Sequence, residues 1–452
     1  MALTQLTTAS EKRLLWRYSI PAITGMLVQS LYNIIDRIFV AHIPQTGTQA
    51  LAAVGVAFPV MTFISAIGLW FGVGGRVVLS QLLGQKKKQQ AEQLMASLVK
   101  KATGIALMVT VIGCFFLRPL LSLCGANAMI MPEAIAYLRL ILIAAPMNLV
   151  GFMLTKWIST DGQPQRTLLL QVLSTIINVI AAPILIFWCH LGIVGAALAT
   201  VIAQLFLLLG ALQYFCRSHQ RTMTLSFRHT TPVTIQAVMK IGFPSFMMQL
   251  LACTVQLLCN VQLQAKGGHL AVGAMAIVQS VSLLFTQPMF GLSQGMQPLV
   301  SYNQGAHQPQ RVHRFLRLSL CWVSLWSVFG WLVVEGAPQI IVPLFTTNHD
   351  IQRLAVIGLR LFLLALFVDG IQIIITSYYQ AIGNHRASFW LSILRQGLCF
   401  IPLVLILPSV LGMTGVFISG GIADSLAFFI TMGYVGICHH HSRVAHHPTG
   451  KE

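Results

Sequence analysis

This sequence has very few charged residues, and it is poorest in acids. Only 8% of its 452 residues are charged, and just ten residues are Asp or Glu. An ordinary soluble domain carries charge on about 25% of its residues and needs that charge to cover its surface. The shortage excludes a soluble cytoplasmic enzyme, and the 56% hydrophobic content excludes a disordered chain. We therefore predict an integral membrane protein.

Several signatures of chemistry are also absent. The nine cysteines are odd in number and include no Cys-x-x-Cys pair, so neither a disulfide framework nor a cysteine metal site is expected. There is no Walker phosphate loop and no metalloprotease His-Glu pair. The tail clusters His439–His441 and His446–His447 are interpreted as solvated. We expect no catalytic residue, no metal site and no cofactor, and the energy source is expected to be an ion gradient of H⁺ or Na⁺.

Basic residues outnumber acidic ones by 28 to ten, a formal net charge of +18. No basic helix or aromatic platform accompanies this charge, so a nucleic-acid partner is not expected. With a cytoplasmic N-terminus, 21 of the 28 basic residues fall on the cytoplasmic side of the predicted spans and five on the other side. The positive-inside rule then places both termini in the cytoplasm.

Twelve apolar stretches are long enough to cross the hydrocarbon core, which takes about 20 residues each. Their long, continuous runs differ from the ten-residue alternations of a membrane barrel. Several are interrupted by polar residues, so hydropathy by itself can miss one or two. The predicted spans are 16–40, 52–80, 95–117, 134–156, 166–188, 193–215, 239–263, 273–302, 315–336, 354–380, 388–409 and 414–437.

The sequence repeats itself at an offset near 220 residues. Each half holds six spans, an even number, so the halves share one orientation and form a parallel repeat suited to alternating access. We predict an N-lobe at 1–216, a cytoplasmic linker at 217–238, and a C-lobe with a cytoplasmic tail at 239–452. The matched pairs are Pro21 with Pro244, Gly84 with Gly305, LRLILI at 138 with LRLFLL at 359, Gly162 with Gly383, and LGIVG at 191 with LGMTG at 411.

Asp36 is the carboxylate with the most informative surroundings. An acid at membrane depth costs about 2.5 kcal/mol or more on insertion scales, so it needs a partner or a cavity. Asp36 shares a helical stripe with Gln29, Tyr32 and Asn33, and we expect these three side chains to contact cargo. Desolvation favours the neutral form of such an acid, which would let it carry a proton, or it would bind Na⁺ with neutral oxygens. A salt bridge with Arg37 is the structural alternative.

Polar side chains on the other spans are candidates for a cation or cargo site, or for hydrogen bonds between helices. Asp369 is a possible second acid or cation anchor. Asp424 either takes part in function or pairs with Arg395. The neutral candidates are Gln171, Ser174 and Asn178 on the fifth span, Thr200 and Gln204 on the sixth, Gln256 and Asn260 on the seventh, and Gln279 on the eighth.

Particular segments resemble the multidrug and toxic compound extrusion (MATE) family, more its DinF-type branch than its NorM-type branch, over essentially the whole chain. The resemblance implies twelve helices in two six-helix lobes that form a V. It also implies export of organic cations or amphipathic toxins against Na⁺ or H⁺. The segments are SLYNIIDRIFVAH, LAAVGVAFPV, QPLVSYNQGA, QAIGN and LRQGLCFIP.

The family pattern assigns roles to individual positions of this chain. By resemblance, Asp36 is the first-helix aspartate, Pro21 the hinge proline and Gln29 the glutamine above the acid. Asn178 and Thr200 match the family's asparagine and threonine of the fifth and sixth helices.

The chain departs from the family pattern at two places. Ala182, before Pro183, stands where the family often has a second N-lobe aspartate, and helix seven lacks the NorM-type acid. With a single N-lobe carboxylate, H⁺ coupling is favoured over Na⁺ coupling.

The leading hypothesis is an ion-coupled multidrug efflux antiporter that contacts small-molecule drugs, toxins and membrane lipids. We expect a monomer in a bacterial inner membrane. One alternative is a flippase for a lipid-linked precursor, which needs a strongly cationic cavity. The other is a membrane-embedded acyltransferase, which needs an intramembrane His with an acid or nucleophile.

Overall fold

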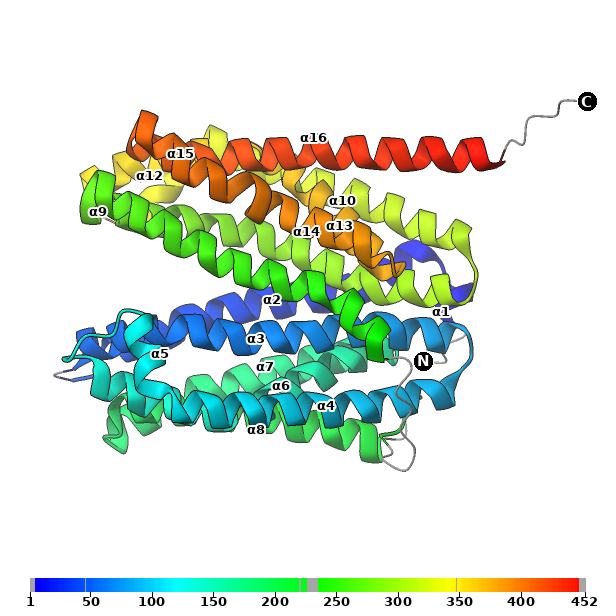
Figure 1. The fold of residues 1–452 in the computed structure, drawn as a ribbon, viewed down its shortest axis with the longest axis horizontal. Helices are drawn as coiled ribbons and strands as arrows, with labels where there is room; N and C mark the ends of the chain where they lie inside the picture. The colour runs from blue at the N-terminus through cyan, green and yellow to red at the C-terminus, as the bar shows by residue number, and fades with distance from the viewer. Residues whose placement is uncertain (1–4, 45, 219–220, 226–234, 347, 447–452) are drawn as a thin grey trace, which may run out of the picture. The chain divides into compact units, whose positions relative to one another are not determined.

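The computed structural model describes residues 5–44, 46–218, 221–225, 235–346 and 348–446, and within these ranges the regular structure is helical (Figure 1). Ten helices in this part of the chain are long and apolar enough to cross a membrane. They are α3 (Gly47–Gly84), α4 (Lys88–Phe115), α6 (Met131–Thr160), α7 (Pro164–Pro183) with the π-helical turn Ile184–Trp188, α8 (Gly192–Arg217), the two arms of α9 (Ile235–Gly268 and Leu270–Gly305), α10 (Pro309–Gly336), α14–α15 (His385–Leu411) and α16 (Met413–His446).

The other two predicted spans are less regular. Helix α2 (Glu11–Ala41) is 31 residues long, but its polar stripe lowers its hydropathy. Helices α12 (His349–Phe362) and α13 (Leu366–Ala381) are long and apolar enough to cross a membrane only together, as a pair bent by 51°. Each of the twelve predicted spans therefore corresponds to a helix, an arm of α9 or a run of consecutive helical elements, and the prediction of an all-helical membrane fold is confirmed.

Local sequence explains where several helices break. Gly268 separates the two arms of α9 because its backbone has φ 64°, a left-handed conformation that glycine adopts easily. The span at 388–409 contains α14 (His385–Ile393), a π-helical turn (Leu394–Phe400) and α15 (Ile401–Leu411). The short elements are α1 (Gln5–Thr8), α5 (Leu117–Leu123), α11 (Pro338–Ile341) and a 3₁₀ turn (Val342–Leu344).

The chain divides into two compact units. The first contains Met1–Cys253, Phe290–Ser319 and Ser377–His385, and the second contains the remaining segments, Thr254–Met289, Leu320–Thr376 and Arg386–Glu452. The first unit thus holds the whole predicted N-lobe together with the ends of several C-lobe helices. The predicted lobe boundary at 217–238 stays a prediction, and 219–220 and 226–234 lie outside the described residues.

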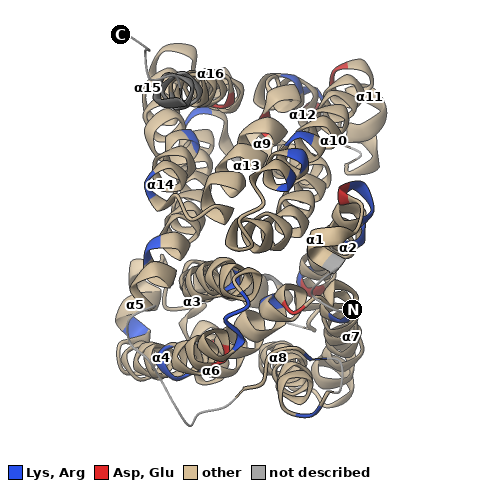
Figure 2. Ribbon diagram, turned by 90° about the vertical axis from the view of Figure 1, so that its right-hand side faces the viewer, with Lys and Arg blue, Asp and Glu red and all other residues tan. Residues whose placement is uncertain are grey.

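In the first unit, α6 packs against α3, α4 and α8, and α7 packs against α2 and α8. Figure 2 looks along these helices and shows α3, α4 and α6 side by side. The indole of Trp157 on α6 is fully buried and donates a hydrogen bond to the carbonyl oxygen of Gly72 on α3, at 3.1 Å. The close packing of α6 gives the unit a rigid frame on which polar side chains of α2, α7 and α8 are held.

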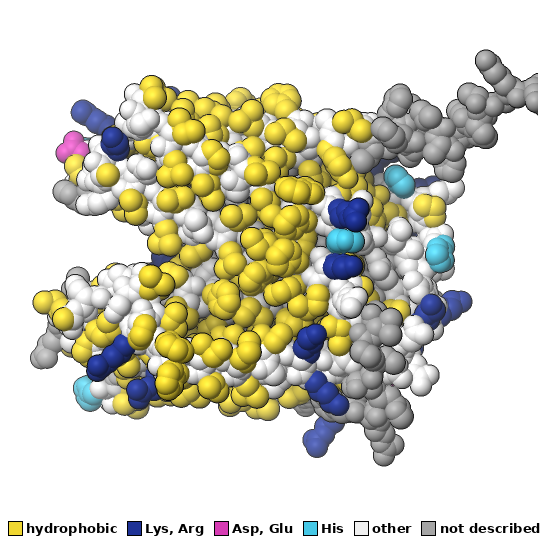
Figure 3. Space-filling model, viewed as in Figure 1, with side chains coloured by type: hydrophobic (Ala, Val, Ile, Leu, Met, Phe, Trp, Pro, Cys, Tyr) yellow, Lys and Arg dark blue, Asp and Glu magenta, His cyan; other side chains and the backbone are white. Residues whose placement is uncertain are grey.

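Large apolar side chains are exposed on the helix surfaces. Phe115 and Trp188 are each more than 80% exposed. On the face drawn in Figure 3, hydrophobic side chains cover much of the helices, while Lys, Arg and His side chains gather near helix ends. This distribution suits a protein whose helices contact lipid, because apolar side chains that face lipid are not exposed to water.

The described part of the linker is hydrogen-bonded to Asp161, the residue that follows α6. The buried carboxylate of Asp161 accepts hydrogen bonds from the Tyr214 hydroxyl at 2.7 Å and from the backbone N–H groups of Thr222 and Met223 at 2.8 and 3.0 Å. Burial raises the pKa of the Asp161 carboxyl, while these hydrogen bonds oppose that rise. One buried acid thereby orders the start of the segment that joins the two sequence halves.

The repeat reappears in the first unit as a symmetric helix contact. A Cβ on Gly84, at the end of α3, would overlap the carbonyl oxygen of Tyr302, and a Cβ on Gly305 would overlap that of Gln81. Gly84 and Gly305 are repeat partners, and so are Gln81 and Tyr302. Each copy of the repeat therefore contacts the other through the same surface, as expected of a two-fold contact, and both glycines are needed for the close approach of the backbones.

We predict that Gly84→Ala destabilises the protein by about 1–3 kcal/mol, because the added methyl group forces two backbones apart. Gly104→Ala in α4 is the matched control, since a Cβ there meets no atom within 4 Å. The control is expected to stabilise the helix by about 0.5–1 kcal/mol. Thermal unfolding of both purified variants in detergent measures the difference, and equal melting temperatures would contradict the close contact.

Candidate functional site

Asp36 lies on α2 in a group of uncharged polar side chains. Its Oδ1 atom is buried and has no hydrogen-bond partner among the described residues. Tyr32, one turn earlier, and Tyr137 of α6 are close enough to interact electrostatically with the carboxylate. Arg37, the alternative partner, forms no ion pair with Asp36 within 4 Å and lies over the Phe58 ring at 5.9 Å, although its positive charge still acts on the carboxylate. The site therefore presents one acid to neutral oxygens.

A hydrogen-bond chain links Tyr32 to α7 and α8. Tyr32 forms a side-chain hydrogen bond with Thr200 of α8. Asn178 of α7 donates through Nδ2 to Thr200 Oγ1 at 3.4 Å, and Thr200 Oγ1 donates to the Ala196 carbonyl at 3.1 Å. Asn178 and Thr200 are both buried. The structure thus brings together Tyr32, Asn178 and Thr200, which the sequence analysis selected from three different spans.

Ala182 is completely buried in the apolar core of the first unit, one turn after Asn178. A carboxylate at this position would lie among apolar side chains without a polar partner. With alanine there, Asp36 is the one acid of the N-lobe site, as the sequence indicates.

The predicted stripe on α2 is divided by the packing. Tyr32 and Asp36 are partly buried, whereas Gln29 and Asn33 are exposed. Pro21 lies inside α2, which continues through it as one helix. Its role as a hinge, and those of Gln29 and Asn33 in cargo binding, stay predictions.

The remaining first-unit candidates have different surroundings. Ser174 Oγ donates to the Ala203 carbonyl of α8 at 2.8 Å, so this hydroxyl serves helix packing. Gln204 has a buried Oε1 atom without a partner in the described part of the chain. Gln171 packs against α2 at Gly25.

In the second unit, Arg395 lies between two aspartates. Its Nη1 atom is 2.7 Å from Asp369 Oδ1, and its Nε and Nη2 atoms donate to Asp424 at 2.6 and 3.4 Å. Asp369 is 2% exposed and Asp424 is 6% exposed. The pairing of Asp424 with Arg395 is confirmed, and Asp369 shares the same cation. With both acids ionised, this cluster carries one net negative charge.

The other candidates of the second unit lie on α9. Gln256 and Asn260 belong to its first arm and are partly buried and exposed, respectively, while Gln279 on the second arm is partly buried. Their proposed contact with cargo stays a prediction. The histidine clusters of the tail fall on residues 439–447, whose side chains lie outside the described part of the chain.

A basic cluster in the first unit was not indicated by the sequence. Lys156, counted among the basic residues of the predicted cytoplasmic side, is 8% exposed within α6 and donates to Gln294 Oε1 at 2.7 Å. Arg76 of α3 is 3% exposed and donates to the Gln294 carbonyl at 3.2 Å. Lys156 stands at the end of its predicted span, so only the packing of α6 reveals its burial.

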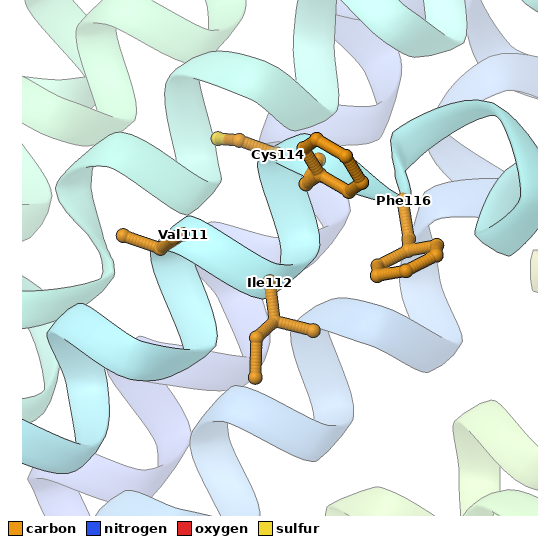
Figure 4. A pocket seen from close by; sticks show the side chains of 5 residues that line it. Val111, Ile112, Cys114 and Phe116 are labelled. Carbon is orange, nitrogen blue, oxygen red and sulfur yellow. The ribbon is translucent and has the colours of Figure 1, made fainter.

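A surface hollow of about 520 Å³ lies at the end of α4 and the start of α5 (Figure 4). Its lining consists of Val111, Ile112, Cys114, Phe115 and Phe116. The four residues other than Cys114 are strongly exposed, and the lining offers no charged group. We interpret it as part of the lipid-facing surface rather than a site for cargo.

Comparison with known proteins gives consistent matches over most of the chain. The MatE family model matches two segments, 21–184 and 244–406. These segments begin at the repeat partners Pro21 and Pro244. The chain is also similar to the multidrug export protein MepA of Staphylococcus haemolyticus (strain JCSC1435), with 28% identity over 420 residues that cover 92% of this chain and 91% of that protein.

Two solved structures illustrate the similarity of fold. The MATE multidrug transporter DinF-BH has a TM-score of 0.87 and 29% identity, covering 94% of this chain and 95% of that one. A multidrug resistance MATE family transporter of the MOP superfamily, solved in an outward-facing conformation, has a TM-score of 0.89 at 23% identity, covering 96% and 97% of the two chains.

We predict that Arg395→Gln destabilises the protein by about 3–5 kcal/mol, because it leaves two buried carboxylates without their cation. Arg360→Gln is the matched control. Arg360 contacts Glu335 at 3.8 Å on the surface, where an ion pair contributes about 0–1 kcal/mol. Thermal unfolding in detergent at neutral pH compares the variants. A native-like melting temperature for Arg395→Gln would show that the cluster is not stabilised as an ion triad.

Proposed function

The chain belongs to the MatE family, and from this membership we propose that it is an antiporter that exports organic cations and amphipathic toxins. Its similarity to a multidrug export protein over nine-tenths of both chains supports this role. Its apolar, lipid-facing helix surface agrees with a multi-pass membrane protein. An inner-membrane location, cytoplasmic termini, a monomeric state and membership of the DinF-type branch are parts of the same proposal.

The coupling ion in this proposal is H⁺, and Asp36 carries it. The observation that supports this choice is the buried Asp36 oxygen without a hydrogen-bond partner in the described residues. A buried carboxylate next to neutral groups is costly when ionised, and protonation removes that cost. Na⁺ would need several oxygen ligands, but the Thr200 hydroxyl already accepts from Asn178 Nδ2 and donates to the Ala196 carbonyl, and Ala182 supplies no second acid.

The proposed cycle uses the two protonation states of Asp36. The ionised carboxylate favours the state that holds cationic cargo, because opposite charges attract. A proton from outside neutralises Asp36, weakens that attraction and allows α2 to rearrange at Pro21, where the missing N–H leaves one helical hydrogen bond unmade. Cargo is then released, and the protein completes the alternating-access cycle with the proton bound to Asp36. Gln29 and Asn33, exposed beside Asp36 on α2, are proposed to contact cargo, as are Gln256, Asn260 and Gln279.

The two alternatives have less support. A lipid-precursor flippase calls for a cationic cavity large enough for a pyrophosphate, but the cavity beside Lys156 has a volume of only about 30 Å³. The sequence GLSQG at 291–295 does match the Gly-x-Ser-x-Gly pattern of hydrolases. It lies inside the second arm of α9, where Ser293 pairs with the Ser377 hydroxyl, and not at the strand-to-helix turn that exposes such a nucleophile.

We predict that Asp36→Asn abolishes drug resistance in a host that lacks its own efflux pumps, because an amide cannot take up and release the proton. Asp350→Asn, on the exposed first turn of α12, is the control and is expected to preserve resistance. Minimum inhibitory concentrations of a cationic dye are measured at matched membrane expression. Full resistance from the Asp36 variant would refute the coupling role.

We also predict that a proton gradient drives cargo transport in proteoliposomes and that a sodium gradient at constant pH does not. The two gradients are imposed separately on the same purified protein, and uptake of a fluorescent cation is recorded. Transport driven by Na⁺ and insensitive to pH would replace H⁺ coupling by Na⁺ coupling. Transport under neither gradient would remove the antiporter model.

A further inference from the structure

Lys156 and Arg76 are two cations buried close together in the first unit. They belong to different helices, α6 and α3, and they are near enough for their charges to repel each other. Both donate to the same residue, Gln294 on the second arm of α9. Lys156 uses the side-chain oxygen of Gln294, and Arg76 uses its backbone oxygen. The two positive charges therefore share one neutral acceptor residue.

Acids do not compensate these cations in the described part of the chain. The ion pairs found there within 4 Å use Glu11, Glu92, Glu335, Asp369 and Asp424, and none of them includes Lys156 or Arg76. Asp161 lies just beyond the end of α6 and its charge acts on Tyr18, but it forms no ion pair with Lys156 or Arg76, and its oxygens accept hydrogen bonds from Tyr214 and Thr222. Lys156 gains some stabilisation from the Phe152 ring, at 5.0 Å. Two buried like charges without a counterion are strongly unfavourable, so the cluster gains stability either by binding an anion or by losing the Lys156 proton.

Hydrogen-bond donors with no acceptor surround the same position. Arg76 Nε and the Tyr18 hydroxyl are buried without partners in the described residues. Lys156 has three N–H donors, of which Gln294 takes one. Unused donors and uncompensated positive charge together indicate an acceptor that carries negative charge.

A cavity joins these groups and limits the size of that acceptor. It has a volume of about 30 Å³ and is lined by Tyr18, Arg76, Lys156 and Gln294, and also by Pro21 and Gln171. One water-sized particle needs about 10–15 Å³ of such volume. The cavity therefore admits two or three particles of that size and is too small for an aromatic drug, a sugar phosphate or a lipid headgroup.

We propose that Lys156, Arg76 and Tyr18 bind a single chloride ion in this cavity. Chloride is close to water in size, accepts hydrogen bonds from all sides and carries the charge that the cluster lacks. A water molecule would satisfy the donors but would leave both positive charges uncompensated. The bound ion joins α2, α3 and α6 beside Pro21 and next to Gln294 of the second arm of α9, so chloride stabilises the packing of the first unit around its proposed hinge.

The test is binding of radiolabelled chloride to the purified full-length protein in detergent at neutral pH, with gluconate keeping the ionic strength constant. We expect saturable binding of about one ion per chain, displaced by bromide and not by sulfate or gluconate. Lys156→Gln should weaken binding at least tenfold. Lys101→Gln removes an exposed lysine and should bind like the native protein.

A second measurement covers the case in which Lys156→Gln does not fold. Tyr18→Phe removes one donor without removing charge, and it should weaken chloride binding several-fold. In the native protein, replacing gluconate with chloride should raise the melting temperature, and in Tyr18→Phe this rise should be smaller. No saturable chloride binding, or equal binding by native protein and both variants, would overturn the proposal. These readouts need neither cargo nor a gradient, so they are independent of the antiporter model.

Discussion

The cost of a charge at membrane depth governs the polar clusters of this protein. Every ionised side chain among packed helices loses its water, so it must be neutralised, paired or solvated by a ligand. Asp36, Arg395 and Lys156 represent three different responses to that constraint. Asp36 is surrounded by neutral oxygens and is proposed to take up a proton. Arg395 contacts two aspartates and compensates one of their two negative charges. Lys156 shares a neutral acceptor residue, Gln294, with a second cation, Arg76.

These responses have different consequences for function. An ion triad such as that of Arg395 holds its charges in place, because separating them exposes each to a low dielectric. A lone acid beside Tyr32 and Thr200 can change its protonation state without breaking an ion pair. The proposed coupling therefore uses the acid that has no ion-pair partner, while the acids that share Arg395 are held in an ion cluster of the second unit.

The repeat adds a geometric constraint to the electrostatic one. Gly84 and Gly305 each approach the backbone of the other copy so closely that a side chain would not fit. Similar approaches occur between Gly74 and Gly242 and between Gly295 and Ser19. These two contacts are copies of each other, because Gly74 is the repeat partner of Gly295 and Ser19 that of Gly242. A duplicated unit produces such contacts in symmetric pairs, because the same surface is present twice. The ends of α3 and of the second arm of α9 are thereby held together in the first unit.

Much of this organisation could be predicted from the sequence. Length and hydropathy place the helices, because a membrane span needs a long apolar segment whatever its neighbours. Motif spacing relates the two halves, and the polar residues Asp36, Asn178 and Thr200 were identified because polar groups in a span are costly. A polar stripe lowers the hydropathy of α2, but its apolar residues still form a stretch long enough to be predicted as a span.

What the sequence by itself determined is therefore the set of helices, their repeat and the family of the chain, since these depend on local composition and order. Only the tertiary structure decided which polar groups share a site. It divided the α2 stripe, joined Tyr32 to Thr200, placed Arg395 between two acids and buried Lys156 beside Arg76. The physical reason is that pairing and burial depend on residues far apart in the chain, and periodicity along one helix does not specify what faces it.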